Sequence, residues 1–502
     1  MPAKPAIDNV FAIDRLHKEE RVFSRVHIIR RIACVLFASV VGYAVPCAAQ
    51  AQGGQGSAQQ QQPPPTSPLA IHVGDADLLI GGFLDMMSVT RSTNTGNGIA
   101  TNFGAIPFKT TATGAPNLTG NLSETRFSAQ NSRLTLQATS KMGGMNVKGY
   151  IEADFLGNTS TNLNVTSNSN GLRMRLYWAQ VTMGKFEFLA GQSWSMMTPN
   201  RNGISPAPGD IFFSQNADTN YQAGLVWART PGFRFILHPS GTLTAGVGLE
   251  NPQQYVGSAV VLPAAFPAGQ VDQGTSNLGA SSPVPNRFPD FIGKIALDPK
   301  MAKLHEHIDA AFLVRSYRTF MPSTSTKFSK TGTAGSINAS LEPGVPNVHI
   351  VLMNYFSDGS GRYIANTNLP DFIVNADGSM ATVSNWSGIY GAEANVKKSL
   401  VYGYYSRAQA DQKTTFDANG TTVIGFGVPN SQSANHKVEE DTVGLTQTLL
   451  RDPKFGGLQI WLQYSHVKRT VFSSPQALPT GTLPGNVAKT NMFYVNFRYI
   501  LP

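Results

Sequence analysis

The chain has 502 residues and a formal net charge of +9. Charged residues make up 14% of it, which is low for a soluble domain, where about 25% is usual. No block of like charge occurs along the chain, so the sequence gives little support to a nucleic-acid partner.

The N-terminus has the features of a secretory signal peptide. Four arginines between residues 21 and 31 precede the apolar run Ile32–Val45, and Ala49–Ala51 offers a small-x-small cleavage site. The apolar run is too short for a transmembrane helix, which needs about 20 apolar residues. We therefore expect residues 1–51 to be a signal peptide.

Both cysteines, Cys34 and Cys47, lie in this segment, so the exported chain has none. Its charge balance is mild, because residues 1–51 hold seven basic and four acidic residues and leave the remainder at +6. An exported protein of this size without a disulfide needs another source of stability. A closed, hydrogen-bonded barrel in lipid is such a source, which favours the outer membrane of a Gram-negative bacterium.

Residues 52–75 are expected to form a low-complexity linker. Gln, Gly and Ser lead into Pro63–Pro65, a composition that buries no apolar area. From residue 76 to residue 502, strand-sized segments recur between Gly, Asn, Pro and Ser. We expect this part of the chain to be a β-barrel.

The clearest strands lie in residues 132–157. Apolar Leu134 and Leu136 alternate with polar Arg133 and Thr135, and a second alternating strand follows a tight glycine turn. Successive strand side chains point to opposite faces, so this hairpin has one apolar and one charged face. A soluble sandwich would also alternate; in a barrel, the apolar face meets lipid and the charged face lines a lumen.

The whole region predicts an all-β, transmembrane antiparallel β-barrel of about 16 strands. The recognisable strands are Leu78–Val89, Ser132–Ser140, Val147–Leu156, Arg173–Met183, Phe186–Trp194, Tyr221–Ala228, Leu243–Leu249, Phe291–Asp298, Ile308–Tyr317, His349–Phe356, Gly388–Val396, Leu400–Ser406, Val443–Leu450, Leu458–Val467 and Met492–Leu501. Two or three more are expected to escape recognition, because barrel strands give a weak signal. The expected long loops are Asn94–Asn121, Pro252–Pro289, Gly359–Asn385 and Ser473–Lys489.

The final strand is typical of bacterial outer-membrane barrels. Phe493, Val495 and Phe497 share one face, and Asn496 lies on the other. The usual terminal Phe is replaced by Leu501-Pro502. Because proline has no amide hydrogen to donate, it fits only at a strand edge or end.

Charged residues on the lumen-facing positions are the candidate functional residues. The cations are Arg133, Lys148, Arg173, Arg175, Lys294 and Arg315, and the acidic residues Glu152 and Asp154 share the lumen with them. Facing lipid would cost each Arg or Lys about 2–4 kcal/mol at mid-depth, so these side chains are expected to point inward. They either pair across the barrel and hydrate its wall, or set up a field that favours anions.

Residues 199–215, which contain Arg201 and Asp210, are the candidate constriction loop. An ordinary external loop is an equal alternative. No catalytic constellation, metal-ligand set or cofactor motif is recognisable, and a passive pore needs none.

The stretches Ser132–Leu134, Glu152–Phe155 and Leu189–Ser195 resemble early strands of the DcaP-like trimeric porins, and Gly361–Ile364 and Val401–Tyr404 resemble later segments. The resemblance implies a 16-stranded barrel, three barrels in each assembly, and uptake of small, mostly negative solutes such as dicarboxylates. Members often carry an N-terminal coiled coil, which Gln/Pro-rich sequence replaces here, so barrel walls would have to hold a trimer together.

The sequence therefore favours a homotrimeric outer-membrane porin in a Gram-negative bacterium, with membrane lipids and small anionic solutes as partners and no cofactor. An outer-membrane enzyme or adhesin on a similar barrel is the alternative. A soluble exported sandwich or lectin is a third interpretation, which the aromatic C-terminal strand disfavours.

Overall fold

The computed structural model describes residues 68–157, 170–274, 285–301, 304–345, 347–472 and 486–502. The expected signal peptide and residues 52–67 of the expected linker lie outside these ranges. The end of that linker is a strand, β1 (Ala70–Val73), which pairs with the start of β2 (Ala76–Arg91).

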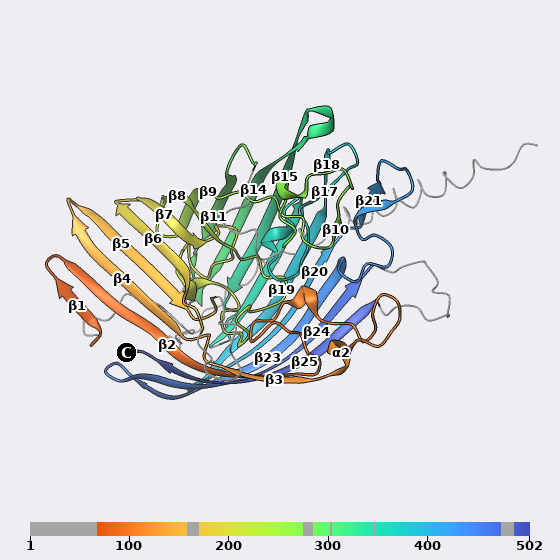
Figure 1. The fold of residues 1–502 in the computed structure, drawn as a ribbon. Helices are drawn as coiled ribbons and strands as arrows, with labels where there is room; N and C mark the ends of the chain where they lie inside the picture. Colours follow the sequence, from red (N-terminus) through yellow and green to blue (C-terminus); the bar gives the residue numbers. More distant parts are fainter. Residues whose placement is uncertain (1–67, 158–169, 275–284, 302–303, 346, 473–485) are drawn as a thin grey trace, which may run out of the picture. The chain divides into compact units, whose positions relative to one another are not determined.

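A single antiparallel sheet closes on itself to make the barrel (Figure 1). After β2, its strands are β3 (Glu124–Ser128), β4 (Arg133–Met142), β5 (Met145–Asp154), β6 (Arg173–Met183), β7 (Phe186–Trp194), β8 (Arg229–Leu237), β9 (Leu243–Glu250), β11 (Asp290–Leu297), β14 (His307–Met321), β15 (Thr326–Leu341), β16 (Val348–Asp358), β19 (Ser384–Val396), β20 (Ser399–Ala410), β23 (Asn435–Asp452), β24 (Gly456–Val471) and β25 (Val487–Ile500). The last strand, β25, pairs with β2 and closes the ring.

The ring has 16 strand positions, as the sequence predicts. The short β3 and β4 pair with successive parts of the same edge of β2, so together they fill one position. The addition of β1 to the other edge of β2 brings the hydrogen-bonded sheet to 18 strands.

The remaining elements are short and lie in the connections. The strands are β10 (Val260–Val261), β12 (Lys300–Met301), β13 (Leu304–His305), β17 (Phe372–Val374), β18 (Met380–Thr382), β21 (Lys413–Phe416) and β22 (Val423–Phe426). The helical turns are η1 (Phe103–Ala105), α2 (Leu118–Asn121), η2 (Pro208–Asp210), η3 (Ala268–Gln270), η4 (Pro322–Thr324) and η5 (Gly361–Tyr363). Across the described ranges, none of the helices has the length and hydropathy to cross a membrane.

The two faces of the barrel wall have opposite character. In β25, Phe493 and Phe497 are each 49% exposed, whereas the intervening Tyr494 and Asn496 are fully buried. The same alternation continues in β4, where Leu134 is exposed and its neighbours are not. Large apolar side chains therefore cover the outside, as expected for a wall that faces lipid.

The glycine turn between β4 and β5 is confirmed. Gly143 and Gly144 have φ values of 53° and 81°. Two successive positive φ values define the hairpin turn whose twist matches the flanking strands. The turn therefore fixes the register that puts Leu136 opposite Ile151 on the outer face.

One predicted strand is wrong, and the barrel strands β3, β8 and β15 are not predicted from the sequence. Tyr221–Ala228 is not a strand; it is a buried part of the segment that joins β7 to β8. Its unbroken apolar run fits burial on all sides as well as it fits a strand. The strands β8 and β15 were not recognised, because β8 contains Pro231 and β15 consists mostly of small and polar residues.

We expect Ile151→Arg to prevent folding of the barrel, because Ile151 points outward and an Arg facing lipid near mid-depth costs about 2–4 kcal/mol. The matched control is Thr182→Arg on β6, where the side chain points inward, is half-buried and lies opposite Glu187. The adjacent inward residue Tyr150 is less suitable, since it is buried against Trp178. The measurement is the heat-modifiable mobility of refolded protein on SDS gels, and equal refolding of both variants would contradict the assignment of faces.

Candidate channel interior

The segment 195–228 crosses the inside of the barrel. Arg201 Nη2 donates to Glu393 Oε1 on β19 at 2.6 Å, and the Ala223 amide donates to Glu440 Oε2 on β23 at 2.7 Å. Strands β19 and β23 lie far around the ring from β7 and β8, which the segment joins. The sequence leaves open whether residues 199–215 fold into the barrel or form an external loop. In the structure they fold into the barrel.

The two charged residues predicted in this segment differ in their surroundings. Burial would lower the pKa of Arg201, but the adjacent Glu393 carboxylate raises this pKa above its ordinary value. Burial also raises the pKa of Asp210, although Arg201 acts in the opposite direction. Arg201 is thus a charged anchor that ties the segment to the opposite wall.

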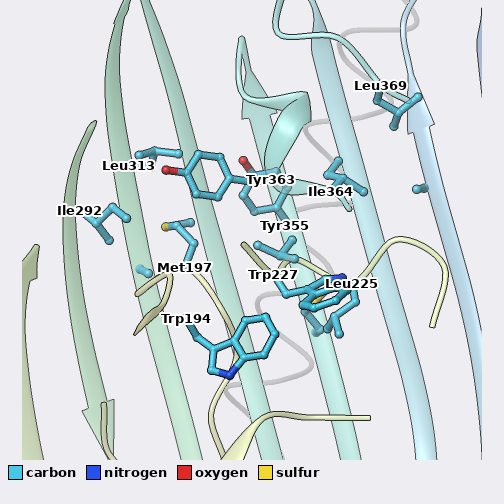
Figure 2. Packing of buried hydrophobic residues seen from close by; sticks show 14 of the residues in the cluster. Trp194, Met197, Leu225, Trp227, Ile292, Leu313, Tyr355, Tyr363, Ile364 and Leu369 are labelled. Carbon is cyan, nitrogen blue, oxygen red and sulfur yellow. The ribbon is translucent and has the colours of Figure 1, made fainter. Parts of the chain in front are cut away.

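Apolar side chains pack the inward segments against the wall (Figure 2). Trp194 and Trp227 lie with their ring centroids 4.9 Å apart. A second inward segment, residues 359–383, adds Tyr363 and Ile364 to the same cluster. These segments occupy part of the space inside the barrel.

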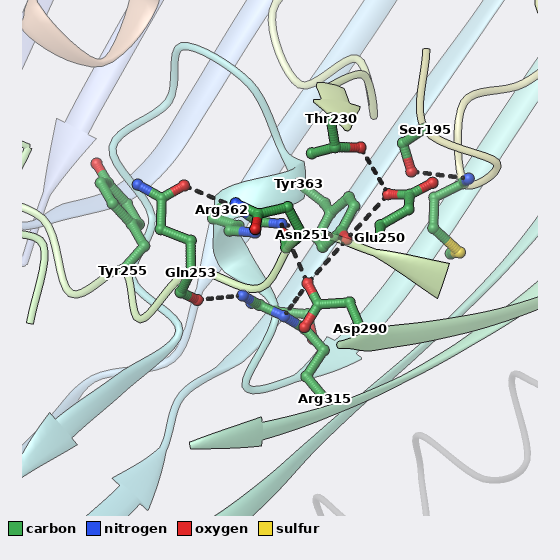
Figure 3. Close-up of polar contacts among 12 residues, drawn as sticks. Ser195, Thr230, Glu250, Asn251, Gln253, Tyr255, Asp290, Arg315, Arg362 and Tyr363 are labelled. Carbon is green, nitrogen blue, oxygen red and sulfur yellow. Dashed lines mark hydrogen bonds and ion pairs between the residues drawn. The ribbon is translucent and has the colours of Figure 1, made fainter. Parts of the chain in front are cut away.

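Arg315, predicted to line the pore, is buried in an ion cluster (Figure 3). Its Nε donates to Asp290 Oδ2 at 3.0 Å, and its Nη1 donates to Asp371 Oδ2 at 2.7 Å. Arg362 also donates to Asp290, at 3.0 Å. These pairs link β11 and β14 to the segment 359–383, so Arg315 holds an inward segment in place.

Lys294 has a similar environment. Its side chain is fully buried, and its Nζ lies 3.2 Å from Asp309 Oδ2. The same Nζ donates to the Thr198 carbonyl at 2.8 Å and to Asn200 Oδ1 at 2.9 Å. For Lys294 and Arg315, the structure favours charge pairing inside the wall over direct contact with solute.

The predicted basic residues of β6 meet the predicted acidic residues of β5. Arg175 donates to Glu152 at 2.5 Å and to Asp154 at 2.7 Å, and its side chain is only 2% exposed. Arg173 donates two hydrogen bonds, of 2.9 and 2.7 Å, to the carboxylate of Asp154. Arg133 on β4 lies 3.6 Å from Glu152.

These arginines differ in their access to solvent. The Arg173 side chain is 35% exposed and that of Arg133 is 13% exposed, in contrast to Arg175. Lys148, lower on β5, is half-buried with its Nζ 5.9 Å from the ring centroid of Trp178. Arg173 and Lys148 are therefore the predicted cations best placed to meet a solute.

Arg229, the first residue of β8, is an inward cation that the sequence pattern does not predict. Its guanidinium lies over Trp194 at 5.6 Å and over Trp227 at 6.0 Å. Repulsion from Arg175 and Arg173 acts on its charge, and weaker attraction from Asp154 and Glu152 opposes this repulsion. Among the described residues, no carboxylate lies within ion-pair distance of Arg229.

We call Arg133, Arg173, Arg175 and Arg229 the arginine cluster. Its two described carboxylate partners are Glu152 and Asp154. Four positive charges against two negative ones leave an excess of two positive charges at one place in the lumen. A site of this kind can attract a carboxylate that is itself partly hydrated.

The reason why the sequence does not predict Arg229 is clear. Arg229 and Arg234 lie on β8, which the sequence does not predict, and Arg362 lies in an inward segment that the sequence predicts as a long loop. The alternation of Arg234 between Phe233 and Phe235 was an available signal for an inward cation.

For metal binding, the described residues include no group of three His, Cys, Asp or Glu that could hold an ion. The absence of a cofactor stays a prediction.

No protein-family profile matches the chain, and no curated protein matches it. Among solved structures, the outer membrane channel DcaP of Acinetobacter baumannii matches 85% of this chain and 97% of its own, with a TM-score of 0.58 and 17% identity. The anion-selective porin from Comamonas acidovorans matches 85% of this chain and 99% of its own, with a TM-score of 0.45 and 12% identity. The resemblance expected from the sequence is thus confirmed at the level of the fold: the chain has the fold of the DcaP channel.

Proposed function

We propose that the protein is a passive diffusion channel of the Gram-negative outer membrane for small hydrophilic solutes, with a preference for organic anions such as dicarboxylates. The barrel with its apolar outside supports membrane insertion, since the pairing of β25 with β2 closes the ring of described strands. The observation that carries the anion preference is the excess positive charge of the arginine cluster, with Arg229 the least neutralised member.

In this proposal, the members of the cluster have separate tasks. Arg175 and Arg133 together neutralise Glu152 and Asp154, so these carboxylates do not repel an approaching anion. Arg173 and Arg229 receive the solute, because Arg173 is partly exposed and Arg229 has no described carboxylate partner. The planar guanidinium can bind a carboxylate through two hydrogen bonds.

Binding has to be weak for the solute to leave, and two arginines that share one dicarboxylate allow this. One carboxylate group can be released while the other is held, so the solute moves stepwise. The screening length at physiological salt is about 8 Å, so only charges beside a narrow path act on the solute. The inward segment 195–228 supplies such a narrowing.

Removal of the receiving charges is expected to weaken anion selectivity. In Arg173→Gln and Arg229→Gln, reversal potentials in a salt gradient should move towards zero, and the double variant should move furthest. Loss of one charged hydrogen bond, about 1.5 kcal/mol, corresponds to about tenfold weaker dicarboxylate binding. Block of chloride current by succinate measures this affinity.

Two further variants serve as comparisons in this experiment. Lys327→Gln removes one positive charge from an exposed position on β15 and should leave selectivity unchanged. Arg175→Gln should instead impair folding, because it leaves two buried carboxylates without their principal partner. A cation-selective wild type, or an unchanged Arg173/Arg229 double variant, would refute the proposed anion site.

We also propose a homotrimer, on the basis of the resemblance described above. The protein should migrate as a trimer in SDS at room temperature and as a monomer after boiling. All backbone hydrogen bonds of a closed barrel are internal, so the walls that would hold the trimer together stay folded in SDS. Gel mobility with and without heating, together with chemical crosslinking, measures this. Monomer mass in unboiled samples, with no crosslinked species, would refute it.

A further inference from the structure

A second basic site lies outside the lumen, at the end of the barrel that carries the long connections. It is a pocket of about 440 Å³ lined by Pro107, Lys109, Lys468, Val487 and Lys489. Lys468 is on β24, Lys489 is on β25, and Lys109 is in the connection between β2 and β3. We call it the lysine pocket.

The pairing of the two strands makes this pocket electrostatically unfavourable when it is empty. Lys468 and Lys489 are directly opposite each other in the register of β24 and β25. Like charges at directly opposed positions of an antiparallel pair destabilise the sheet. The described ion-pair partner of Lys468 is Glu439 on β23 at 3.6 Å, and the Lys468 side chain remains 42% exposed. Glu439 also lies 4.0 Å from Arg407, so the three lysines keep an excess of at least two positive charges.

The third lysine is held over this pair by a fixed loop. Arg469, which points inward beside Lys468, lies 4.4 Å from the Phe108 ring centroid and donates to the Gly104 carbonyl at 2.5 Å. The Lys109 carbonyl accepts a hydrogen bond from the Asn117 amide at 2.8 Å. The loop therefore has a defined position, and the pocket exists before any ligand binds.

The height of the pocket on the outer wall suggests what fills it. Going up β25, the outward residues are Phe493, Asn491 and then Lys489, and Tyr464 on β24 bonds Asn491 at 2.9 Å. Lys489 is thus four residues above the last outward aromatic residue of its strand. Four residues rise about 13 Å along a strand, which a tilt of about 45° reduces to about 9 Å along the membrane normal. That is the depth of lipid headgroups, just outside the apolar band.

We propose that the lysine pocket binds a phosphate group of the phosphorylated glycolipid in the outer leaflet. The proposal rests on the proposed function, because it requires the barrel to lie in an outer membrane with its long connections on the outer side. A phosphate neutralises the repulsion between Lys468 and Lys489, and Lys109 closes over it from the loop. The lipid chains then lie along the apolar wall below.

The test uses the purified full-length barrel in uncharged detergent, with bisphosphorylated lipid A as the probe. Each of Lys109→Gln, Lys468→Gln and Lys489→Gln should weaken lipid A binding about fivefold, the effect of one basic residue near a charged lipid surface. Lys489→Arg should retain binding. The matched control is Lys454→Gln, an exposed lysine in the turn at the opposite end of the barrel. Equal binding by wild type, pocket variants and control would overturn the proposal.

Two further measurements separate the alternatives. Inorganic phosphate and dephosphorylated lipid A should each bind much more weakly than lipid A, and a match between inorganic phosphate and lipid A would overturn the assignment to a lipid. Without lipid, Lys489→Gln should raise the unfolding temperature, because it removes the repulsion; a lower temperature would contradict this argument.

Channel recordings in bilayers without lipid A distinguish this proposal from the proposed function. The pocket variants should conduct as the wild type does, since the pocket lies outside the lumen. A protein that binds lipid A through these lysines but does not conduct would refute the channel and leave the lysine pocket standing.

Discussion

The pairing of β25 with β2 is the constraint on which the rest of the structure depends. A backbone amide or carbonyl that faces hydrocarbon without a partner is costly, so a sheet in a membrane has to close. The chain meets this requirement with its first and last long strands, from Phe83 opposite Ile500 to Arg91 opposite Met492. Because the sheet is closed, one face of every strand points into the barrel and the other points outward. The apolar exterior, the charged interior and the inward segments all follow from that division.

Where alternation is regular, the sequence predicts the structure closely. The strands Arg173–Met183 and Phe186–Trp194 have the expected bounds, because a short turn and regular alternation mark both. The fold class and strand number follow from the same signal. Alternation fails to predict β15, because its small polar residues give no contrast between the two faces. It also fails for residues 221–228, which are mostly apolar because they are packed inside the barrel.

The interior was harder to predict for a different reason. Alternation identifies which cations point inward, and Arg173, Arg175 and Arg315 do, but it says nothing about their partners across the lumen. Arg315 contacts Asp371, which is 56 residues away in a connection that contains only short elements. Arg229 lies where two inward tryptophans converge. Such pairings depend on how long connections pack, and no periodicity in the sequence encodes that packing.

Buried ion pairs and exposed cations therefore have different roles in this barrel: the pairs stabilise the fold, and the cations can bind a ligand. Pairs such as Lys294 with Asp309 tie the inward segments to the wall, and removing one partner would leave an uncompensated buried charge. Cations without a full complement of carboxylates are the ones that can act on something outside the protein. Among the described residues, such cations occur around Arg229 inside the barrel and around Lys489 outside it. The net charge of the whole chain is mild. The local excess of positive charge at each position, and not the net charge, can therefore attract an anion in the lumen or a phosphate at the membrane surface.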